Sequence, residues 1–333
     1  MKKALLLALA LAALVAASEA LILVRVRIDP AHLAWFLTGL ALTLTAVGGL
    51  SVSGAVKQLR HLAVHWPALA VGLPFSLLAP YLIFAFGTAT FSLVALGKLI
   101  AYIGVPTLLL FPDRLHRAER VGWRDFAAML ALGLPVSAGW LRGIWVWPPD
   151  AVFTEGYELY LFRPLFCVCV GAYGFLVIRN LEGVGYRLGF RKKDIVDGLA
   201  NFAAFALPAI PLGYALGFIA FRPQSVSLGE FAAQLFTIYL TIAIPEELLF
   251  RGILQNFLVR SLRGPRHGLY GLLLASVIFG ASHLHHAPVP NWRYALMATL
   301  AGIFYGNAYR TRQRLSSPAL THALVDVVWH FWF

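Results

Sequence analysis

The sequence predicts an all-α fold, a polytopic transmembrane helical bundle of about eleven spans, from three observations. First, 60% of the 333 residues are hydrophobic and only 13% are charged, with a mean hydropathy of +0.75. A soluble domain of this composition could not cover its surface with polar groups. Second, apolar runs reach about 20 residues, the length that crosses roughly 30 Å of hydrocarbon. Third, these runs lack the short alternating pattern of β-barrel strands.

Charged breaks divide the apolar runs into predicted spans. They lie near residues 4–24, 31–52, 67–87, 89–111, 125–147, 157–178, 195–220, 231–258, 268–286, 293–309 and 318–333. The first, which begins "MKKALLLALALAALVAASEA", also has the form of a cleaved signal peptide. Because its apolar run continues as "LILVR", we expect it to stay as a membrane anchor. Either outcome leaves the rest of the predicted topology unchanged.

Basic residues concentrate in alternate loops. They are Lys57 and Arg60; Arg114, Arg117, Arg120 and Arg124; Arg179, Arg187, Arg191, Lys192 and Lys193; Arg260, Arg263 and Arg266; and Arg310, Arg312 and Arg314. Since Lys and Arg accumulate in cytoplasmic loops, these loops are predicted to be cytoplasmic and the C-terminus to lie on the far side. The same rule accounts for the net charge of +12. No basic patch interleaved with aromatic residues indicates a nucleic-acid partner, so the expected surroundings are the lipid bilayer.

Ionisable residues within the spans concentrate after residue 240. We therefore expect residues 1–150 to form an N-terminal transmembrane extension of about five spans, and residues 151–333 a core of about six. The only cysteines, Cys167 and Cys169, are two residues apart. On a helix they point to different sides, so we expect small buried apolar residues rather than a disulfide.

The stretch "LTIAIPEELLFR" (240–251) places charges inside an apolar run. Glu247 and Arg251 are four residues apart on one helix face, and pairing is the least costly arrangement for charges in hydrocarbon. Glu246 is rotated by about 100° from Glu247 and lacks that partner. Pro245 removes one helix hydrogen bond and is expected to kink the helix. A buried carboxylate without a cation suits a general base, although both glutamates could instead form one ionic cluster for packing.

Two further spans carry polar residues at helical spacing. In "VIFGASHLHH" (277–286), Phe279 and His283 share a face, while His285 and His286 lie at the expected membrane interface. In the last span, His322 and Asp326 are four residues apart. Each pair has a structural alternative, a buried core histidine in one case and a helix-packing hydrogen bond in the other.

Together these side chains suit hydrolysis. A carboxylate activates water, a histidine orients it, and a second polar pair stabilises the oxyanion. One glutamate with two histidines also matches a catalytic zinc shell, so a zinc ion held by Glu246, His283 and His322 stays open.

The three motifs resemble those of a known family, the CPBP intramembrane proteases, which include type II CAAX prenyl endopeptidases and bacteriocin self-immunity proteins. That family is marked by EExxxR, FxxxH and HxxxN/D, which stand here as "EELLFR" (246–251), "FGASH" (279–283) and "HALVD" (322–326). The resemblance covers roughly 157–333. A weaker likeness to exosortase-like peptidases would require Cys167 beside a His and Arg pair, and the sequence offers no such context.

The resemblance implies a role for each motif residue. Glu246 activates water and His283 helps to position or deprotonate it. His322 and Asp326 face the scissile carbonyl as oxyanion stabilisers. Supporting roles fall to Glu247 and Arg251, which hold the first motif in shape, and to Phe279, which packs beside His283. The family's chemistry is described as metal-dependent or glutamic-type, so the resemblance implies no definite cofactor.

One residue departs from the family pattern, because Asp326 stands where many members have Asn. An ionised Asp repels an oxyanion, so Asp326 is either neutral or serves to orient His322.

The three motifs are also expected to lie at different depths in the membrane. At about 1.5 Å per residue Glu246 lies roughly 21 Å from Arg260, whereas His322 follows shortly after Pro318, so the last span must begin inside the membrane or tilt strongly.

The sequence therefore predicts an intramembrane endopeptidase that hydrolyses a peptide bond of a membrane-associated peptide or protein. The signal-like start and short loops favour a bacterial inner membrane. The alternative is a non-catalytic multi-pass protein, either transporter-like or an immunity scaffold, that uses the polar cluster structurally. A transporter is expected to show broken helices in two related halves, and the sequence shows no such repeat.

Overall fold

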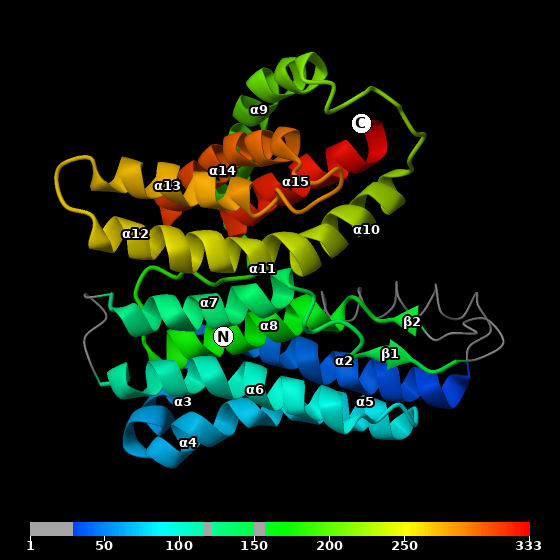
Figure 1. Ribbon diagram of the computed structural model, residues 1–333, viewed down its shortest axis with the longest axis vertical. Coiled ribbons are helices and arrows are strands. Elements are labelled where there is room, and N and C mark those ends of the chain that lie inside the picture. The colour runs from blue at the N-terminus through cyan, green and yellow to red at the C-terminus, as the bar shows by residue number, and fades with distance from the viewer. Residues whose placement is uncertain (1–28, 116–120, 150–156) are drawn as a thin grey trace. The chain divides into compact units, whose positions relative to one another are not determined.

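The computed structural model describes residues 29–115, 121–149 and 157–333, and almost all regular structure in them is helical (Figure 1). The all-helical prediction is confirmed. The chain divides into two compact units: unit 1 runs to Leu181, and unit 2 runs from Glu182 to the C-terminus and includes a short piece at Val121. The predicted boundary near residue 150 lies within unit 1 of this division. The first predicted span, 4–24, and its two interpretations lie outside the described residues.

Unit 1 consists of a helical bundle with one two-stranded antiparallel sheet, β1–β2. Its helices and strands are α2 (Pro30–Leu50), α3 (Ser53–His65), α4 (Pro67–Gly72), the 3-10 turn Leu73–Leu77, α5 (Leu78–Gly87), α6 (Leu93–Leu110), the 3-10 turn Phe111–Asp113, α7 (Trp123–Ser137), β1 (Val146–Trp147), β2 (Tyr157–Glu158), α8 (Phe162–Ala172) and the π-helical segment Tyr173–Ile178.

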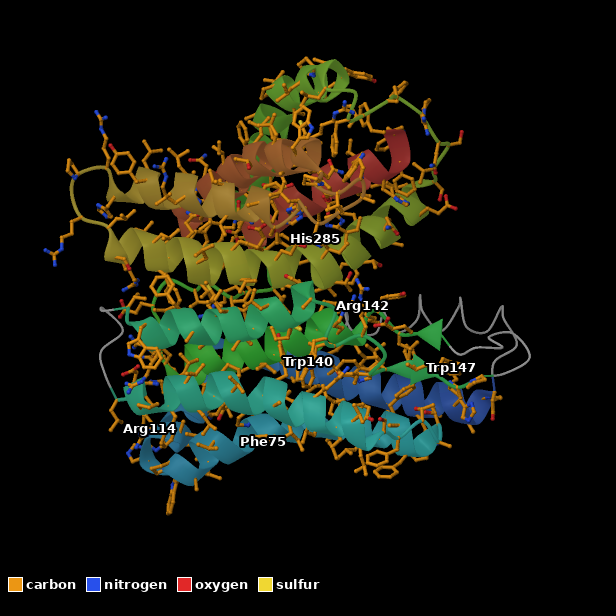
Figure 2. All side chains as sticks on the ribbon, in the orientation of Figure 1. Phe75, Arg114, Trp140, Arg142, Trp147 and His285 are labelled. Atoms are coloured by element: carbon orange, nitrogen blue, oxygen red, sulfur yellow. The ribbon has the colours of Figure 1, made fainter. Side chains whose placement is uncertain are left out.

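Local sequence explains where helix α2 begins. The Asp29 side chain accepts a hydrogen bond from the Ala31 amide, and Pro30 occupies the first helical position, where no amide hydrogen is needed. Inside unit 1, aromatic rings fill the space between helices; Phe36, for example, packs edge-on against Phe162 and Trp147. In Figure 2 Arg114 lies at one end of this unit and Trp147 towards the other.

A buried ion pair ties α7 to the π-helical segment after α8. The Arg179 Nε donates to Asp125 Oδ1 at 2.7 Å, and both side chains are almost inaccessible to solvent. Asp125 also accepts from the Gly122 amide, so the carboxylate closes the start of α7 as well. This pair joins parts of the sequence 54 residues apart.

Unit 2 carries all three motifs. Its elements are α9 (Lys192–Ala215), α10 (Leu228–Ile238), the π-helical segment Tyr239–Ala243, α11 (Ile244–Glu247), the π-helical segment Leu248–Gln255, α12 (Asn256–Ser261), α13 (His267–Ala281), α14 (Trp292–Arg312) and α15 (Ser316–Trp332). Figure 1 shows α10, α11 and α12 as one continuous ribbon from yellow-green to yellow, so the charged stretch lies within a single long helix.

Every predicted span within the described residues contains a helix or a continuous helical stretch, but two of them also include a strand: the span 125–147 leaves helix α7 at Ser137 and ends in β1, and the span 157–178 begins in β2. Of these helical stretches, five are long and apolar enough to cross a membrane: Pro30–Leu50, Pro67–Gly87, Leu93–Asp113, Lys192–Ala215 and Leu228–Ser261. Phe162–Ile178 and His267–Ala281 are apolar but shorter. The chain is therefore a multi-pass membrane protein, while the predicted number of about eleven spans is not confirmed.

Two loops that were predicted to be cytoplasmic meet in unit 2. Arg314 donates to the Gly189 carbonyl at 2.7 Å and to the Asp194 carboxylate at 3.1 Å. Burial lowers the pKa of Arg187 most, and repulsion from the positive charges of Arg314 and Arg191 lowers it further. Positive charge thus gathers at the start of α9, as expected if both loops lie on one side of the membrane.

Helices α13 and α14 approach closely because α14 presents glycine towards its neighbours. A Cβ atom at Gly302 would lie 3.1 Å from the Ser276 Cα, and one at Gly306 would lie 2.7 Å from the Gln255 Oε1. Only glycine permits this spacing without movement of the neighbours. The close packing brings α14 against the two helices that carry the first and second motifs.

Candidate active site

The first motif lies where the long helix departs from regular α geometry. Pro245 lacks an amide hydrogen, and π-helical segments precede and follow α11. Such wide turns occur frequently at functional sites, because each one changes the direction in which the following side chains point. Here the two glutamates differ: the Glu247 side chain is fully buried, whereas Glu246 is 36% exposed.

Glu247 and Arg251 form the predicted salt bridge. The Arg251 Nη1 donates to Glu247 Oε1 at 2.9 Å, and both side chains are buried. The guanidinium also lies between two aromatic rings, 4.3 Å from the Phe279 centroid and 5.1 Å from the Tyr305 centroid. A desolvated cation between aromatic faces is stabilised by their quadrupoles. The first and second motifs are thereby joined through Arg251 and Phe279.

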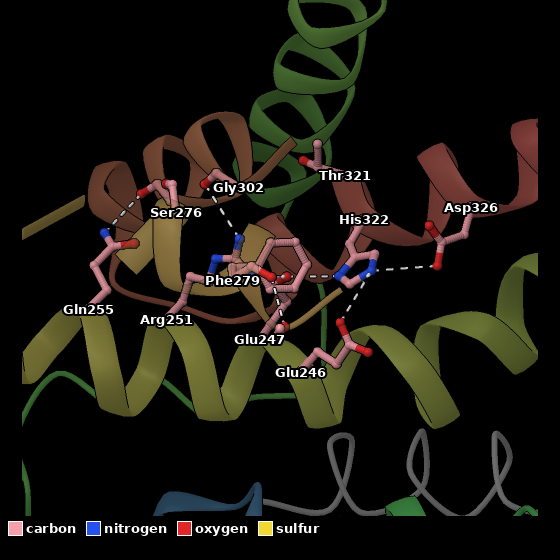
Figure 3. Close-up of polar contacts among 12 residues, drawn as sticks. Glu246, Glu247, Arg251, Gln255, Ser276, Phe279, Gly302, Thr321, His322 and Asp326 are labelled. Atoms are coloured by element: carbon pink, nitrogen blue, oxygen red, sulfur yellow. Dashed lines mark hydrogen bonds and ion pairs between the residues drawn. The ribbon is translucent and has the colours of Figure 1, made fainter. Parts of the chain in front are cut away.

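His322 lies among three carboxylates (Figure 3). Its Nδ1 is 2.8 Å from Glu247 Oε1, and its Nε2 is 3.5 Å from Asp326 Oδ2 and 3.9 Å from Glu246 Oε2. Since Glu247, as an ionised carboxylate, can only accept hydrogen bonds, Nδ1 carries a hydrogen towards it. The other ring nitrogen, Nε2, therefore faces Glu246 and Asp326. His322 and Asp326 lie close together, as expected. Glu247 has two partners, Arg251 and His322.

Aromatic packing fixes the plane of the His322 ring. Tyr305 stacks on it, with centroids 4.6 Å apart and an interplanar angle of 17°, and Phe279 meets it edge-on at 5.9 Å. Tyr305 was not singled out in the sequence. Its only signal was its position between Gly302 and Gly306, the two glycines that allow α14 to approach.

His283 lies just beyond the end of α13. Its Nδ1 is 2.8 Å from the Phe279 carbonyl oxygen, and its ring contacts Phe279 at 4.8 Å, as predicted, and Tyr294 at 4.7 Å. A carbonyl accepts only, so Nδ1 carries the hydrogen and Nε2 is left as an acceptor. The neighbouring His285 and His286 are exposed, with His286 stacked beside His283 at 5.7 Å.

The four predicted catalytic side chains line one cavity of about 150 Å³. Glu246, His283, His322 and Asp326 all contribute to its wall, and the remainder of the lining is almost entirely apolar. The structure thus brings the three motifs to a shared space rather than to separate surfaces. Their catalytic roles stay predictions.

The alternative that the sequence left open, a zinc ion held by Glu246, His283 and His322, is not matched by a ligand shell in the described structure. Within the described ranges, no group of three or more His, Cys, Asp and Glu side chains is placed to hold a metal ion. The His283 Nδ1 is engaged by a carbonyl and the His322 Nδ1 by Glu247, so Nε2 is the remaining nitrogen of each ring. We derive no catalytic step through a metal.

The two cysteines are free thiols, as expected. Both lie on α8 of unit 1, whereas the site histidines lie in unit 2. The structure therefore gives no Cys–His pair within either unit's described part that matches the exosortase-like alternative.

Comparison with known proteins agrees with the location of this site. Residues 228–328 match the family model described as type II CAAX prenyl endopeptidase Rce1-like. This range contains all three motifs and most of the cavity lining. The predicted resemblance to the CPBP intramembrane proteases is thereby confirmed over residues 228–328.

A curated relative gives a second match. The uncharacterized protein YpbD of Bacillus subtilis (strain 168) is 33% identical over 89 residues, which is 27% of this chain and 40% of YpbD. The chain therefore matches about two fifths of the length of this curated relative. No solved structure matches the chain.

Proposed function

We propose that the protein is an intramembrane endopeptidase that hydrolyses a peptide bond of a membrane-associated peptide or protein with a water molecule activated by Glu246. The observation that supports this most directly is the shared cavity. Two carboxylates and two imidazoles face the same space, which is otherwise apolar and surrounded by helices. Ionisable groups at membrane depth are costly and are typically retained for function. The family-model match over the same residues supports peptide-bond cleavage.

In this mechanism Glu246 removes a proton from water, and the resulting hydroxide attacks the scissile carbonyl carbon. His283 accepts a hydrogen bond from the water through Nε2, because its Nδ1 is held by the Phe279 carbonyl. The oxyanion that develops accepts a hydrogen bond from Nε2–H of His322, whose ring then carries a hydrogen on both nitrogens, because Nδ1 also donates to Glu247. When the C–N bond breaks, the proton held by Glu246 passes to the departing amine.

The surrounding charges support this division of roles. Glu247, which is paired with Arg251, orients His322 from the Nδ1 side. Asp326 lies 3.5 Å from Nε2 and orients the ring from the other side. An ionised Asp326 cannot donate to an oxyanion, so the donor is His322. Of the two states predicted for Asp326, neutral or orienting His322, we therefore assign it the orienting role.

A non-catalytic scaffold is the rival function, and one observation favours it. Arg251, Glu247, Phe279 and Tyr305 form a closed network that would stabilise helix packing without any chemistry. Glu246 separates the two functions, because its carboxylate lies outside that network and faces the cavity.

The decisive experiment uses the full chain, purified and reconstituted in liposomes. Two quenched fluorescent peptides serve as substrates, one with a farnesylated cysteine and one with the same sequence unmodified. Glu246→Gln is expected to lower kcat by about 10²–10⁴-fold, the usual contribution of a general base. The matched control is Glu230→Gln on the same long helix, where Gln preserves the capping box with Ser227.

Two results would contradict the proposal. Unchanged cleavage by Glu246→Gln would exclude Glu246 as the base. Absence of cleavage of both peptides by the wild-type protein, together with retained folding, would favour the scaffold.

The cellular setting is part of the same proposal. The basic loops are cytoplasmic, the membrane is a bacterial inner membrane, and the macromolecular partner is the membrane-associated substrate. The meeting of two basic loops at the start of α9 supports a common side for them.

A further inference from the structure

The cavity continues from the catalytic side chains into an apolar lobe, which we define by Phe205, Ala209, Ala298, Ala301, Val325 and Trp329. Three helices form it, and each contributes one face. On α15, Val325 and Trp329 are three and seven residues beyond His322, so they follow it along the same face. The lobe therefore adjoins the polar groups of the cavity.

Spacing on α14 gives the distance between the lobe and the polar groups. Ala298, Ala301 and Tyr305 recur at helical spacing, and Tyr305 stacks on His322. At 1.5 Å per residue, Ala301 lies about 6 Å and Ala298 about 10 Å along the helix from Tyr305. A long side chain adjacent to a peptide bond held at His322 therefore points towards Ala301, the nearer of the two.

Small residues create the space in the lobe. Ala209 on α9 and Ala298 and Ala301 on α14 are buried, at 3%, 5% and 5% exposure. Their larger neighbours are Phe205, Met297 and Tyr305, which belong to the same buried cluster. Alanine at these positions leaves room beside a wall of large rings, so a larger residue at any of them would fill the lobe.

The size of the space indicates what fits. The whole cavity measures about 150 Å³, and an apolar cavity of about that volume accommodates benzene. One leucine, methionine or phenylalanine side chain is of this size. A farnesyl chain has more than twice the carbon atoms of benzene, so only part of it would lie inside this cavity.

We propose that the apolar lobe is a specificity subsite for one large, unmodified apolar side chain of the substrate, next to the scissile bond. Ala209, Ala298 and Ala301 set its depth. This inference rests on the proposed peptidase function, and the test below separates the two.

The first arm of the test is a cleavage profile. The reconstituted full chain is given a library of peptides randomised around a fixed core, and products are identified by mass spectrometry. At one position flanking the cleaved bond we expect Leu, Met or Phe to exceed Ala by about 10-fold or more, because each missing methylene in an apolar pocket costs about 10–200-fold. Ala298→Phe is expected to reduce this ratio at least 10-fold and to retain cleavage of the Ala peptide.

Two further variants serve as a second test of the lobe and as a control. Ala209→Leu fills the lobe from α9 and is expected to shift the profile in the same direction, should Ala298→Phe fail to fold. Leu296→Phe places the same new ring on the exposed side of α14, where Leu296 is 43% exposed, and is expected to leave the profile unchanged. A wild-type profile without a size preference at either flanking position would overturn the subsite. So would a profile unchanged in both lobe variants, or a preference for farnesylated cysteine over leucine.

The second arm measures binding without catalysis. A peptide carrying photo-leucine is cross-linked to the Glu246→Gln protein, and the labelled residues are mapped. We expect labels within 202–210 and 297–301, reduced at least fivefold by Ala298→Phe. Labels confined to other segments would overturn the subsite. If the wild-type protein cleaves nothing, the peptidase function fails while this arm still decides the subsite.

Discussion

Replacing Arg251 by methionine removes the guanidinium that pairs with Glu247. Arg251 donates to Glu247 Oε1 at 2.9 Å and to the Gly302 carbonyl at 3.4 Å, and its guanidinium lies against Phe279 and Tyr305. Methionine fills a similar volume without charge. The substitution therefore tests the electrostatic contribution with little change in packing.

The expected loss follows from burial. Arg251 and Glu247 are 1% and 0% exposed, and removal of one member of a buried pair costs about 3–5 kcal/mol because the other charge stays buried. His322 still contacts Glu247 at 2.8 Å, which keeps the loss near the lower end. In the double variant Arg251→Met with Glu247→Gln, no buried charge is left unpaired and Gln can still accept from His322. We expect it to be more stable than the sum of the single changes by about 1–3 kcal/mol.

The assay is reversible unfolding of the full chain in mixed micelles, followed by far-UV circular dichroism, with the free energy of unfolding as the readout. Arg310→Met is the matched control. Arg310 is exposed and its hydrogen bond to Asn307 lies at the surface, so its loss is expected to change stability by no more than about 0.5 kcal/mol. A free energy of unfolding for Arg251→Met within about 1 kcal/mol of the wild type, or a double variant without coupling, would contradict this expectation.

Two further substitutions test the packing around each unit's core. Gly302→Val places a Cβ atom 3.1 Å from Ser276 and is expected to lower the melting temperature, because overpacking costs about 1–3 kcal/mol. Its control is Gly49→Val, since a Cβ atom at Gly49 meets open space. Equal melting temperatures for the two variants would contradict the close approach of α14 to α13. Asp125→Asn removes the carboxylate that Arg179 binds at 2.7 Å and is expected to cost about 3–5 kcal/mol in the same unfolding assay; a loss below about 1 kcal/mol would show that the pair contributes little to unit 1.

The charged stretch 246–251 shows how far sequence reasoning reached at the site. The spacing of Glu247 and Arg251 predicted their salt bridge correctly, because residues four apart on a helix are neighbours whatever the fold. The contact of Phe279 with His283 follows from the same rule. The contact of Glu247 with its second partner, His322, could not be predicted from this rule, because the two residues are 75 positions apart in sequence. Contacts of that kind depend on how the helices pack.

Tyr305 is a second residue whose contacts could not be predicted from the sequence. Its local sequence offers one signal only, the two glycines Gly302 and Gly306 on either side of it. Its stacking on His322 and its contact with Arg251 arise because Gly302 and Gly306 allow α14 to come close. A residue's packing partner on another helix is a tertiary property, so single-sequence reasoning missed it.

The sequence by itself determined the helical membrane class, the approximate positions of most helices and the three motifs, because hydrophobic length and helical periodicity are local properties. It also indicated which charges pair within one helix. Only the tertiary structure decided that Glu246, His283, His322 and Asp326 line one cavity, that Glu247 orients His322, and that an alanine-lined lobe extends from them. Those features require several helices to meet at fixed distances, and close packing of side chains between helices, rather than any local pattern, sets those distances.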